Sequence, residues 1–299
     1  MGWIIYMKEI WIQKNDANQR LDKFLLKTFP MLSKSMMYKA IRNKKIKVNR
    51  KRCSFDQFLQ ENDHLLLFLP PDVLEMKKKS DIKDYGPIDV IYEDDHLLVV
   101  NKPRGLLSQN DRIDQDCLVS RIQYYLYNKG DYDPNLEMSF SPSICHRLDR
   151  NTQGLVLAAK DADTLRAINL AIQERKVHKY YRAFVQGKVE SCTIDIFLKK
   201  EGTKALVRKE WKQGYQRAIT KVKAIRYDGK NTWCDIELLT GRFHQIRASL
   251  AYIGHPLVSD VKYGGTLIKN KPYQLIAYRL DLKDLDDEYL KKEFELDAF

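Results

Sequence analysis

Apolar residues near the start of the chain recur at the intervals of an amphipathic helix. Leu21, Phe24, Leu25 and Phe29 follow this spacing, and Pro30 ends the run because proline cannot continue a helix. The pattern therefore predicts a first short helix that ends before this proline and turns one face toward a core.

The next segment predicts a second helix and two strands. Ser33 can cap the helix, and Met37 and Ile41 repeat on one of its faces. Residues 46–49 alternate apolar and polar positions, which indicates a half-buried strand, and the apolar run 65–69 indicates a buried one. Two helices and these strands form a small α/β unit.

Strand patterns dominate the rest of the chain. Strands are predicted at 88–92, 97–101, 154–159, 181–187, 219–227 and 232–239. Helical spacing is found near 162–175 and 244–253, and the polar, turn-rich stretch 126–143 predicts an exposed loop. We therefore expect a mixed, strand-rich α+β domain.

A stretch with two prolines and a run of lysines separates these two parts of the chain. Residues 70–87 show little periodicity and are interpreted as a linker. We expect a module at 1–69, with a core at about 20–69, and a second domain at 88–299. The second domain ends in an acidic tail from Asp281 onward, which has eight acidic residues against three lysines.

Charge is concentrated in the small module. The 299-residue chain has a formal charge of +12, and the segment 20–52 alone holds twelve Lys and Arg residues against Asp22, a charge of +11. Such a concentration favours a polyanionic partner, because released counterions drive the association. A single lysine could equally belong to a solvated face that keeps the protein soluble. Taken together, these charges favour contact with RNA.

Other classes of function are disfavoured by what the sequence lacks. The five cysteines are scattered without a CxxC pair, and no short His/Cys cluster offers a zinc site. The chain has no glycine-rich dinucleotide loop and no Walker loop, and its apolar runs are too short to span a bilayer. We expect a soluble protein of the reducing cytoplasm, with no metal and no membrane segment.

Charged residues crowd together just before the predicted strand 154–159. His146, Arg147, Asp149 and Arg150 occupy this position, and polar groups at the entrance of a strand line clefts. The two flanking arginines favour the charged form of the carboxylate, so we expect Asp149 to stay ionised at neutral pH. The alternative is a solvated surface ion pair, which is the commoner fate of charged clusters.

Two more segments combine polar groups with an apolar pattern. Arg242 and Arg247 flank the start of a predicted helix with an apolar face, so both cannot point into solvent. Tyr180 and Tyr181 alternate along a predicted strand, so one faces inward and the other outward. Ordinary cross-strand packing would account for the tyrosines equally well.

Four segments together resemble the RluA-type pseudouridine synthase family. They are IYEDDHLLVVNKPRGL (91–106), HRLDRNTQGL (146–155), KYYRAFVQG (179–187) and TGRFHQIRASLAYIGHPLVSD (240–260), and they occur in the family's order. In the basic module, RLDKFLLKTFPMLSKSMMYKAIRNKKIKVN resembles the ribosomal-protein-S-four-like RNA-binding domain. The resemblance implies a catalytic domain with a mixed, mainly antiparallel sheet.

The resemblance also implies roles for individual residues. Asp149 in HRLD matches the family's catalytic aspartate, Tyr181 its active-site tyrosine, and Arg247 the arginine that pairs with the aspartate. His146 and Arg147 match positions near the nucleotide that is turned out of the RNA. These five residues therefore form the expected active site.

The implied reaction converts uridine in RNA to pseudouridine. The bond from the sugar to the base nitrogen breaks, the base turns, and ring carbon five bonds to the sugar, so no cofactor is needed. Asp149 would act as a nucleophile or as the base in a glycal route, and both alternatives stay open. The target base must leave its stack, and we expect Arg147 to fill the gap.

Contact with RNA is expected from both domains. The expected contact residues are His146, Arg147, Arg150, Arg242, Lys44, Lys45, Arg50, Lys51 and Arg52. The appended module favours large-subunit ribosomal RNA as the target, with transfer RNA as the alternative. The competing functions are a non-catalytic ribosome-assembly factor and a hydrolase that releases free uracil. We expect a monomer.

Two positions depart from the family's pattern. Arg104 stands where a small residue is commoner, and Ser259 replaces the usual glycine before Asp260. Neither belongs to the expected catalytic residues, so the departures affect local loop geometry and the fit of the substrate.

Overall fold

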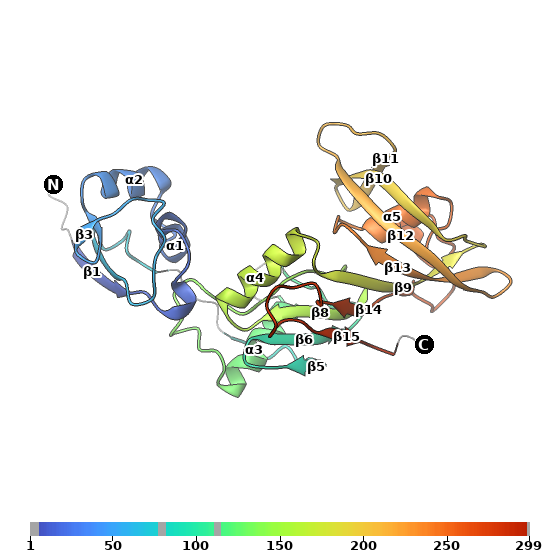
Figure 1. Cartoon of the computed structure of the whole chain (residues 1–299), viewed down its shortest axis with the longest axis horizontal. Coiled ribbons are helices and arrows are strands. Elements are labelled where there is room, and N and C mark those ends of the chain that lie inside the picture. The colour runs from blue at the N-terminus through green and yellow to red at the C-terminus, as the bar shows by residue number, and fades with distance from the viewer. Residues whose placement is uncertain (1–5, 77–81, 111–114, 298–299) are drawn as a thin grey trace.

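Two β-sheets organise the residues that the computed structural model describes, which are 6–76, 82–110 and 115–297. The basic module lies at one end of the molecule, and one edge of the larger sheet lies at the other (Figure 1). Residues 77–81 of the predicted linker fall outside the described residues.

The module has a four-stranded antiparallel sheet, in the order β1-β4-β2-β3, packed against two helices. Its elements are β1 (Tyr6–Trp11), the short 3-10 helix η1 (Lys14–Asp16), α1 (Leu21–Thr28), α2 (Lys34–Arg42), β2 (Ile46–Val48), β3 (Lys51–Arg52) and β4 (His64–Leu69). The Ser33 hydroxyl caps α2 by accepting a hydrogen bond from the Met36 N–H. Phe24, Phe29 and Leu65 are fully buried between the helices and the sheet.

The helices and strands predicted for the module are present, whereas β1 was not predicted. Ile10 is the one buried residue of β1, so the strand lacks a clear alternation of apolar and polar positions. Its conformation depends on pairing with β4. Val73 and Leu74, which follow β4, are also buried in the module's core.

The larger sheet has eleven strands. Nine of them follow the order β11-β10-β12-β13-β9-β14-β8-β6-β5, while β15 pairs with β14 and β7 with β8. Among the described residues the pair β14–β8 is the parallel one, and the other pairs are antiparallel. The prediction of a mixed, mainly antiparallel sheet is therefore confirmed.

The strands of this sheet come from most of the second domain. They are β5 (Val90–Glu93), β6 (Leu97–Lys102), β7 (Ser143–Ile144), β8 (Gln153–Ala159), β9 (His178–Gln186), β10 (Cys192–Glu201), β11 (Lys204–Arg208), β12 (Gln216–Tyr227), β13 (Asn231–Leu238), β14 (Leu275–Asp281) and β15 (Glu293–Glu295). Strand β15 lies within the segment expected to be an acidic tail.

Helices pack on both faces of the larger sheet. They are α3 (Leu118–Lys129), α4 (Ala162–Gln173), α5 (Gln245–Tyr252) and the short 3-10 helix η2 (Val261–Tyr263). Helices α3 and α5 share a core with one face, whereas α4 packs on the other through Ile168 against Leu155 and Leu157. No helix in the described ranges is long and apolar enough to cross a membrane.

Helix α3 replaces the first part of the loop predicted at 126–143. Leu118, Ile122 and Leu126 are buried at a spacing of four residues, which is a helical signal that the surrounding polar residues obscure. The sequence pattern also missed β10, β11 and β14. Strand β11 forms the edge of the sheet, where most side chains are exposed or half-buried. In β10, Ile194, Ile196 and Leu198 are buried at every second position, so a short alternating signal is present there.

The module is joined to the larger domain by a buried polar contact. Asp16, which has no exposed surface, accepts hydrogen bonds from the backbone N–H and the hydroxyl of Ser139, at 2.9 and 2.5 Å. Met138 packs against the apolar core of the module. The Asn15 side chain accepts a hydrogen bond from the N–H of Ala162 at the start of α4. Polar and apolar contacts together give the module a defined position.

The parallel pair depends on a glycine. Gly154 has a φ of +122°, and a Cβ atom there would overlap the backbone of Ala277. We expect Gly154→Ala to lower the free energy of unfolding by about 3 kcal/mol or more, because overlap and backbone strain add. Gly130→Ala is the matched control, since Gly130 has a positive φ but open space, and it should cost about 1–2 kcal/mol. Equal urea midpoints for the two variants would contradict the overlap.

Candidate active site

A cavity of about 480 Å³ opens between the loop before β8 and the start of α5. Its walls include six of the residues expected from the sequence, namely His146, Arg147, Asp149, Tyr181, Arg242 and Arg247. They come from three of the four motif segments. Asp149 and Arg247 are 98 residues apart in the chain, so the fold of the larger sheet brings them together.

The residues on either side of Asp149 are anchored to the end of β6 and the segment that follows it. The Ser108 hydroxyl donates to the Leu148 carbonyl at 2.7 Å and accepts from the Leu148 N–H at 3.0 Å. The fully buried ammonium of Lys102 donates to the Arg150 carbonyl at 3.1 Å and to two carbonyls of its own loop. Burial lowers the pKa of Lys102 to about 8. Sequence reasoning missed both anchors, although Lys102 lies in the first motif.

Arg247 is the most tightly held charged group of the cavity. Its Nε and Nη2 donate to the two carboxylate oxygens of Asp260, at 2.7 and 2.8 Å. The guanidinium carbon lies 5.0 Å from the ring centroid of Tyr263 and 4.9 Å from that of Tyr273. Its third nitrogen, Nη1, reaches Asp149 Oδ2 at 3.4 Å. The predicted contact with Asp149 is present, but Asp260 is the closer partner, and sequence reasoning missed it.

Burial, and not the neighbouring arginines, has the largest effect on the pKa of Asp149. Removal from water raises this pKa, while Arg247 and Arg147 lower it by less. The sequence showed only the arginines, so it indicated the opposite direction. A quarter of the Asp149 side chain remains exposed, so the carboxylate can be reached from the cavity.

Tyr181 lies on the cavity face of β9 and is almost completely buried. Burial is the main reason that the pKa of its hydroxyl is raised, and the charge of Asp149 acts in the same direction. The group therefore stays protonated at neutral pH and can donate a hydrogen bond.

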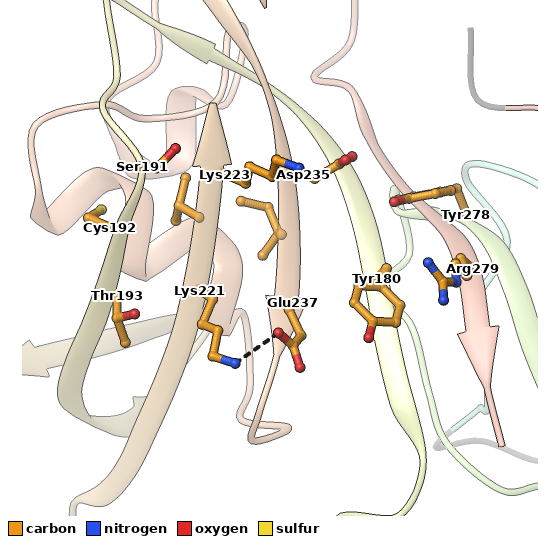
Figure 2. Close-up of a pocket in the computed structure, with 12 residues that line it drawn as sticks. Tyr180, Ser191, Cys192, Thr193, Lys221, Lys223, Asp235, Glu237, Tyr278 and Arg279 are labelled. Atoms are coloured by element: carbon orange, nitrogen blue, oxygen red, sulfur yellow. Dashed lines mark hydrogen bonds and ion pairs between the residues drawn. The ribbon is translucent and has the colours of Figure 1, made fainter. Parts of the chain in front are cut away.

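Tyr180 lies on the opposite face of the sheet, as the predicted alternation of the two tyrosines requires. Figure 2 shows this face, where Tyr180 lines a second cavity of about 540 Å³. The guanidinium of Arg279 lies 4.7 Å from the Tyr180 ring centroid, and Lys221 pairs with Glu237 at 3.1 Å.

His146 is a neutral group at the wall of the first cavity. Its Nε2 accepts a hydrogen bond from the Leu157 N–H at 3.1 Å, so the ring hydrogen must be on Nδ1. Burial lowers the pKa of His146 to about 3. Nδ1 is buried and has no hydrogen-bond partner among the described residues.

The remaining arginines expected to contact RNA are exposed but differ in position. Arg147 and Arg242 line the cavity, and Arg242 also donates to the Arg217 carbonyl at 3.1 Å. Arg150 is not part of the wall and donates to the Gly105 carbonyl at 2.9 Å. The basic residues of the module lie at the end of α2 and around the β2–β3 turn, and all are exposed: Lys44, Lys45, Arg50, Lys51 and Arg52.

The two departures from the family's pattern have visible effects. Ser259 has a φ of +67°, a conformation that glycine adopts more easily, and it comes directly before Asp260. The Arg104 guanidinium lies over the Tyr273 ring and donates to the Tyr273 carbonyl. Arg104 therefore supports one of the rings that flank Arg247.

His244 is a further residue that sequence reasoning did not place in the site. It directly precedes α5 with a φ of +51°, and its Nε2 lies 3.7 Å from Asp149 Oδ2. Its neighbour Phe243 also lines the cavity. Within the described ranges, no group of three or more His, Cys, Asp and Glu residues could hold a metal ion.

Asp260 should matter for stability as well as for the site. Asp260→Ala leaves the buried Arg247 without its main partner, so we expect the free energy of unfolding to fall by about 3–5 kcal/mol. Asp195→Ala is the matched control, because Asp195 pairs with Arg217 through two contacts in an exposed position. It should cost less than about 1 kcal/mol. Similar shifts of the urea midpoint in both variants would contradict the buried role of Asp260.

Two family models match the sequence. The model described as RNA pseudouridylate synthase matches residues 96–252. The model described as S4 domain matches residues 19–65, within the basic module. The first match contains Asp149, Tyr181 and Arg247, and covers just over half of the chain.

Relatives of this chain carry corresponding names. A protein of Mycoplasma capricolum, named "Uncharacterized RNA pseudouridine synthase", is 34% identical over 297 residues, covering 93% of each chain. A protein of Buchnera aphidicola subsp. Schizaphis graminum, named "Ribosomal large subunit pseudouridine synthase C", is 33% identical over 85% of this chain and 80% of the relative.

Solved structures show the same fold. "Human RNA Pseudouridylate Synthase Domain Containing 4" is similar with a TM-score of 0.56 and 19% identity, over 70% of this chain and 87% of that chain. "Human RNA Pseudouridylate Synthase Domain Containing 1" gives a TM-score of 0.54 and 22% identity, over 73% and 85%.

Proposed function

The chain belongs to the RNA pseudouridylate synthase family and is an isomerase that acts on RNA; on that premise, we propose that it converts uridines of large-subunit ribosomal RNA, with Asp149 as the catalytic residue. The observation that carries the proposal is the Asp149 carboxylate, which is open to a cavity and faces a guanidinium held by Asp260.

The isomerisation needs one ionised carboxylate beside the sugar of the target nucleotide. The bond from the anomeric carbon to the base nitrogen breaks and a bond from the same carbon to ring carbon five forms. The hydrogen on ring carbon five is lost, the nitrogen gains one, and no electrons enter or leave. Asp149 can attack the sugar as a nucleophile or remove a sugar proton in a glycal route. Either role requires the charged form that Arg247 favours.

Other residues of the cavity would hold the base while it turns. The protonated hydroxyl of Tyr181 is a donor that can bind a carbonyl oxygen of a uracil ring. Arg247 orients Asp149, and Asp260 keeps Arg247 in place on its other side. These groups bind and orient, and Asp149 alone carries the covalent or proton-transfer step.

The target base must be turned out of the RNA to enter the cavity. Unstacking costs a few kcal/mol, and a side chain that occupies the vacated position lowers this cost. Arg147 is exposed at the cavity wall and precedes Asp149 by two residues, so it is our candidate for this position. Arg242, on the other side of the cavity, can contact a neighbouring phosphate.

Large-subunit ribosomal RNA is favoured as the target by the relative from Buchnera aphidicola, whose name states that substrate. Transfer RNA is the alternative, and the uridine itself is left to experiment. The non-catalytic alternative requires that the Asp149 carboxylate be dispensable.

The catalytic role of Asp149 is tested by mapping pseudouridines in RNA from a strain that lacks this protein. Restoring wild type should return at least one pseudouridine in large-subunit RNA, and purified Asp149→Asn should modify that RNA at an initial rate about 10²–10⁴-fold or more below that of purified wild type. Asp195→Asn, in an exposed ion pair, is the control and should behave as wild type. Equal modification by wild type and Asp149→Asn would reject Asp149 as the catalytic residue, and modification confined to transfer RNA would reject the ribosomal target.

The basic module should supply phosphate contacts that depend on salt. Changing its exposed cluster to glutamine should weaken binding to large-subunit RNA and lower the slope of log affinity against log salt by about 0.7–0.9 for each lost contact. The cluster is Lys44, Lys45, Arg50, Lys51 and Arg52. A variant of three exposed lysines on the larger domain, Lys188, Lys223 and Lys230, is the control and should leave the slope unchanged. Equal slopes for wild type and the module variant would contradict phosphate contact there.

A further inference from the structure

A chain of hydrogen-bonding groups leads from the edge strand β11 to Asp149. The Ala205 N–H in β11 donates to the Tyr263 hydroxyl oxygen at 2.8 Å. The same oxygen lies 2.9 Å from His244 Nδ1. On the other side of the imidazole, His244 Nε2 lies 3.7 Å from Asp149 Oδ2. Three segments far apart in the sequence thus meet in one line that ends at the carboxylate.

The first contact sets the direction of the others. Because the Tyr263 oxygen already accepts a hydrogen bond from Ala205, donation of its own hydrogen to His244 Nδ1 satisfies both its acceptor and its donor capacity, which favours this direction over a second acceptance. Nδ1 then acts as an acceptor, and the ring hydrogen of a neutral imidazole must be on Nε2. That N–H faces the carboxylate.

The surroundings keep His244 neutral and fixed. Only 9% of its side chain is exposed, and Arg247, Lys262 and Lys200 are nearby positive charges. Burial, with these charges, lowers the pKa of His244 to about 3. The Phe243 ring stacks on the imidazole at 3.8 Å. A positive φ in a residue other than glycine costs of the order of 1 kcal/mol, so the surrounding contacts hold His244 in this place.

We propose that Tyr263 and His244 are positioning residues, in which Tyr263 selects the tautomer that presents the His244 Nε2–H to the catalytic carboxylate. The inference rests on the proposed role of Asp149. At 3.7 Å the pair is longer than a hydrogen bond, and such contacts shorten when the substrate closes the site.

The tautomer of His244 determines the direction in which the pKa of Asp149 should shift when the Tyr263 hydroxyl is removed. Without the Tyr263 hydroxyl, Nδ1 can carry the hydrogen, and the lone pair of Nε2 then faces the carboxylate. This arrangement disfavours the charged form of Asp149 and so raises its pKa. When the pH is lowered, the variant should therefore lose activity at a higher pH than wild type does. Above that range the carboxylate is ionised in both proteins, and their rates should agree.

Other charged or titratable groups also face Asp149, and they stay in place in the variant. They are Arg247, Arg147, Lys102, Tyr181, Tyr273 and Asp260. Among them, the pKa of Lys102 is lowered to about 8 by burial and those of the tyrosines are raised, so these titrations lie on the alkaline side. Asp260 is the other carboxylate among them, and its two hydrogen bonds from Arg247 are the same in both proteins, so a difference between the two proteins on the acidic side reports on Asp149.

The tautomer itself can be measured without RNA. In protein labelled with ¹⁵N-histidine, long-range nitrogen–proton spectra should show wild-type His244 as the Nε2–H form, assigned by comparison with His244→Gln. Tyr263→Phe should convert this signal to the Nδ1–H form, at least in part. Tyr252→Phe, which removes an exposed hydroxyl from α5, is the matched control and should leave the spectrum unchanged. An unchanged His244 signal in Tyr263→Phe would overturn the proposal.

The coupling to Asp149 is measured by single-turnover rates of tritium release from large-subunit RNA transcribed with [5-³H]uridine. At pH 5.5, Tyr263→Phe should be slower than wild type by about threefold or more, while at pH 8 the two rates should agree within about twofold. An equal loss at every pH, or superimposable profiles, would overturn the coupling. No release by wild type from any transcript would reject the proposed function instead, and the tautomer measurement would still judge the role of Tyr263.

Discussion

A buried guanidinium shared unequally between two carboxylates is the interaction on which the site depends. Asp260 takes two short contacts from Arg247, and Asp149 takes one longer contact from the nitrogen that remains. Asp260 offsets the free-energy cost of removing the Arg247 guanidinium from water. The Asp149 carboxylate is therefore not required as the main partner of this buried charge. Asp149 can therefore stay partly exposed while Arg247 opposes the effect of burial on its charge.

The larger sheet makes this sharing possible. Asp149 comes just before β8, while Arg247 lies on α5, whose apolar side joins the core on one sheet face. Ser108 holds the Leu148 backbone before Asp149, and Lys102 holds the Arg150 carbonyl after it. Lys102 is itself fixed by the Leu106 carbonyl, so the position of the Asp149 carboxylate is set by hydrogen bonds to the backbone on both sides. The aromatic rings of Tyr263 and Tyr273 then pack against the guanidinium.

Sequence patterns predicted what is determined locally. The module helices, several of the buried strands, and the motif residues Asp149 and Arg247 came from spacing or resemblance, whereas the buried strand β14 was missed. The edge strand β11 was also missed, because its conformation comes from pairing with β10 more than from apolar alternation. Asp260 and Tyr263 lie within or just beyond the last motif, but their partners are set by the path of the chain after α5. The rise in the pKa of Asp149 caused by burial could not be predicted from the sequence either, since it depends on the whole cavity wall.

The buried contact between Asp16 and Ser139, with Met138 inserted against the module core, has a consequence for the choice of uridine. On the proposed function, the module binds the sugar–phosphate backbone and the cavity of the larger domain binds the base. The buried contact fixes the distance between these two binding sites. A uridine would then be selected by its distance and orientation from the folded RNA segment that the module binds. The nucleotide sequence around the uridine would matter only through its effect on the folded structure of the RNA.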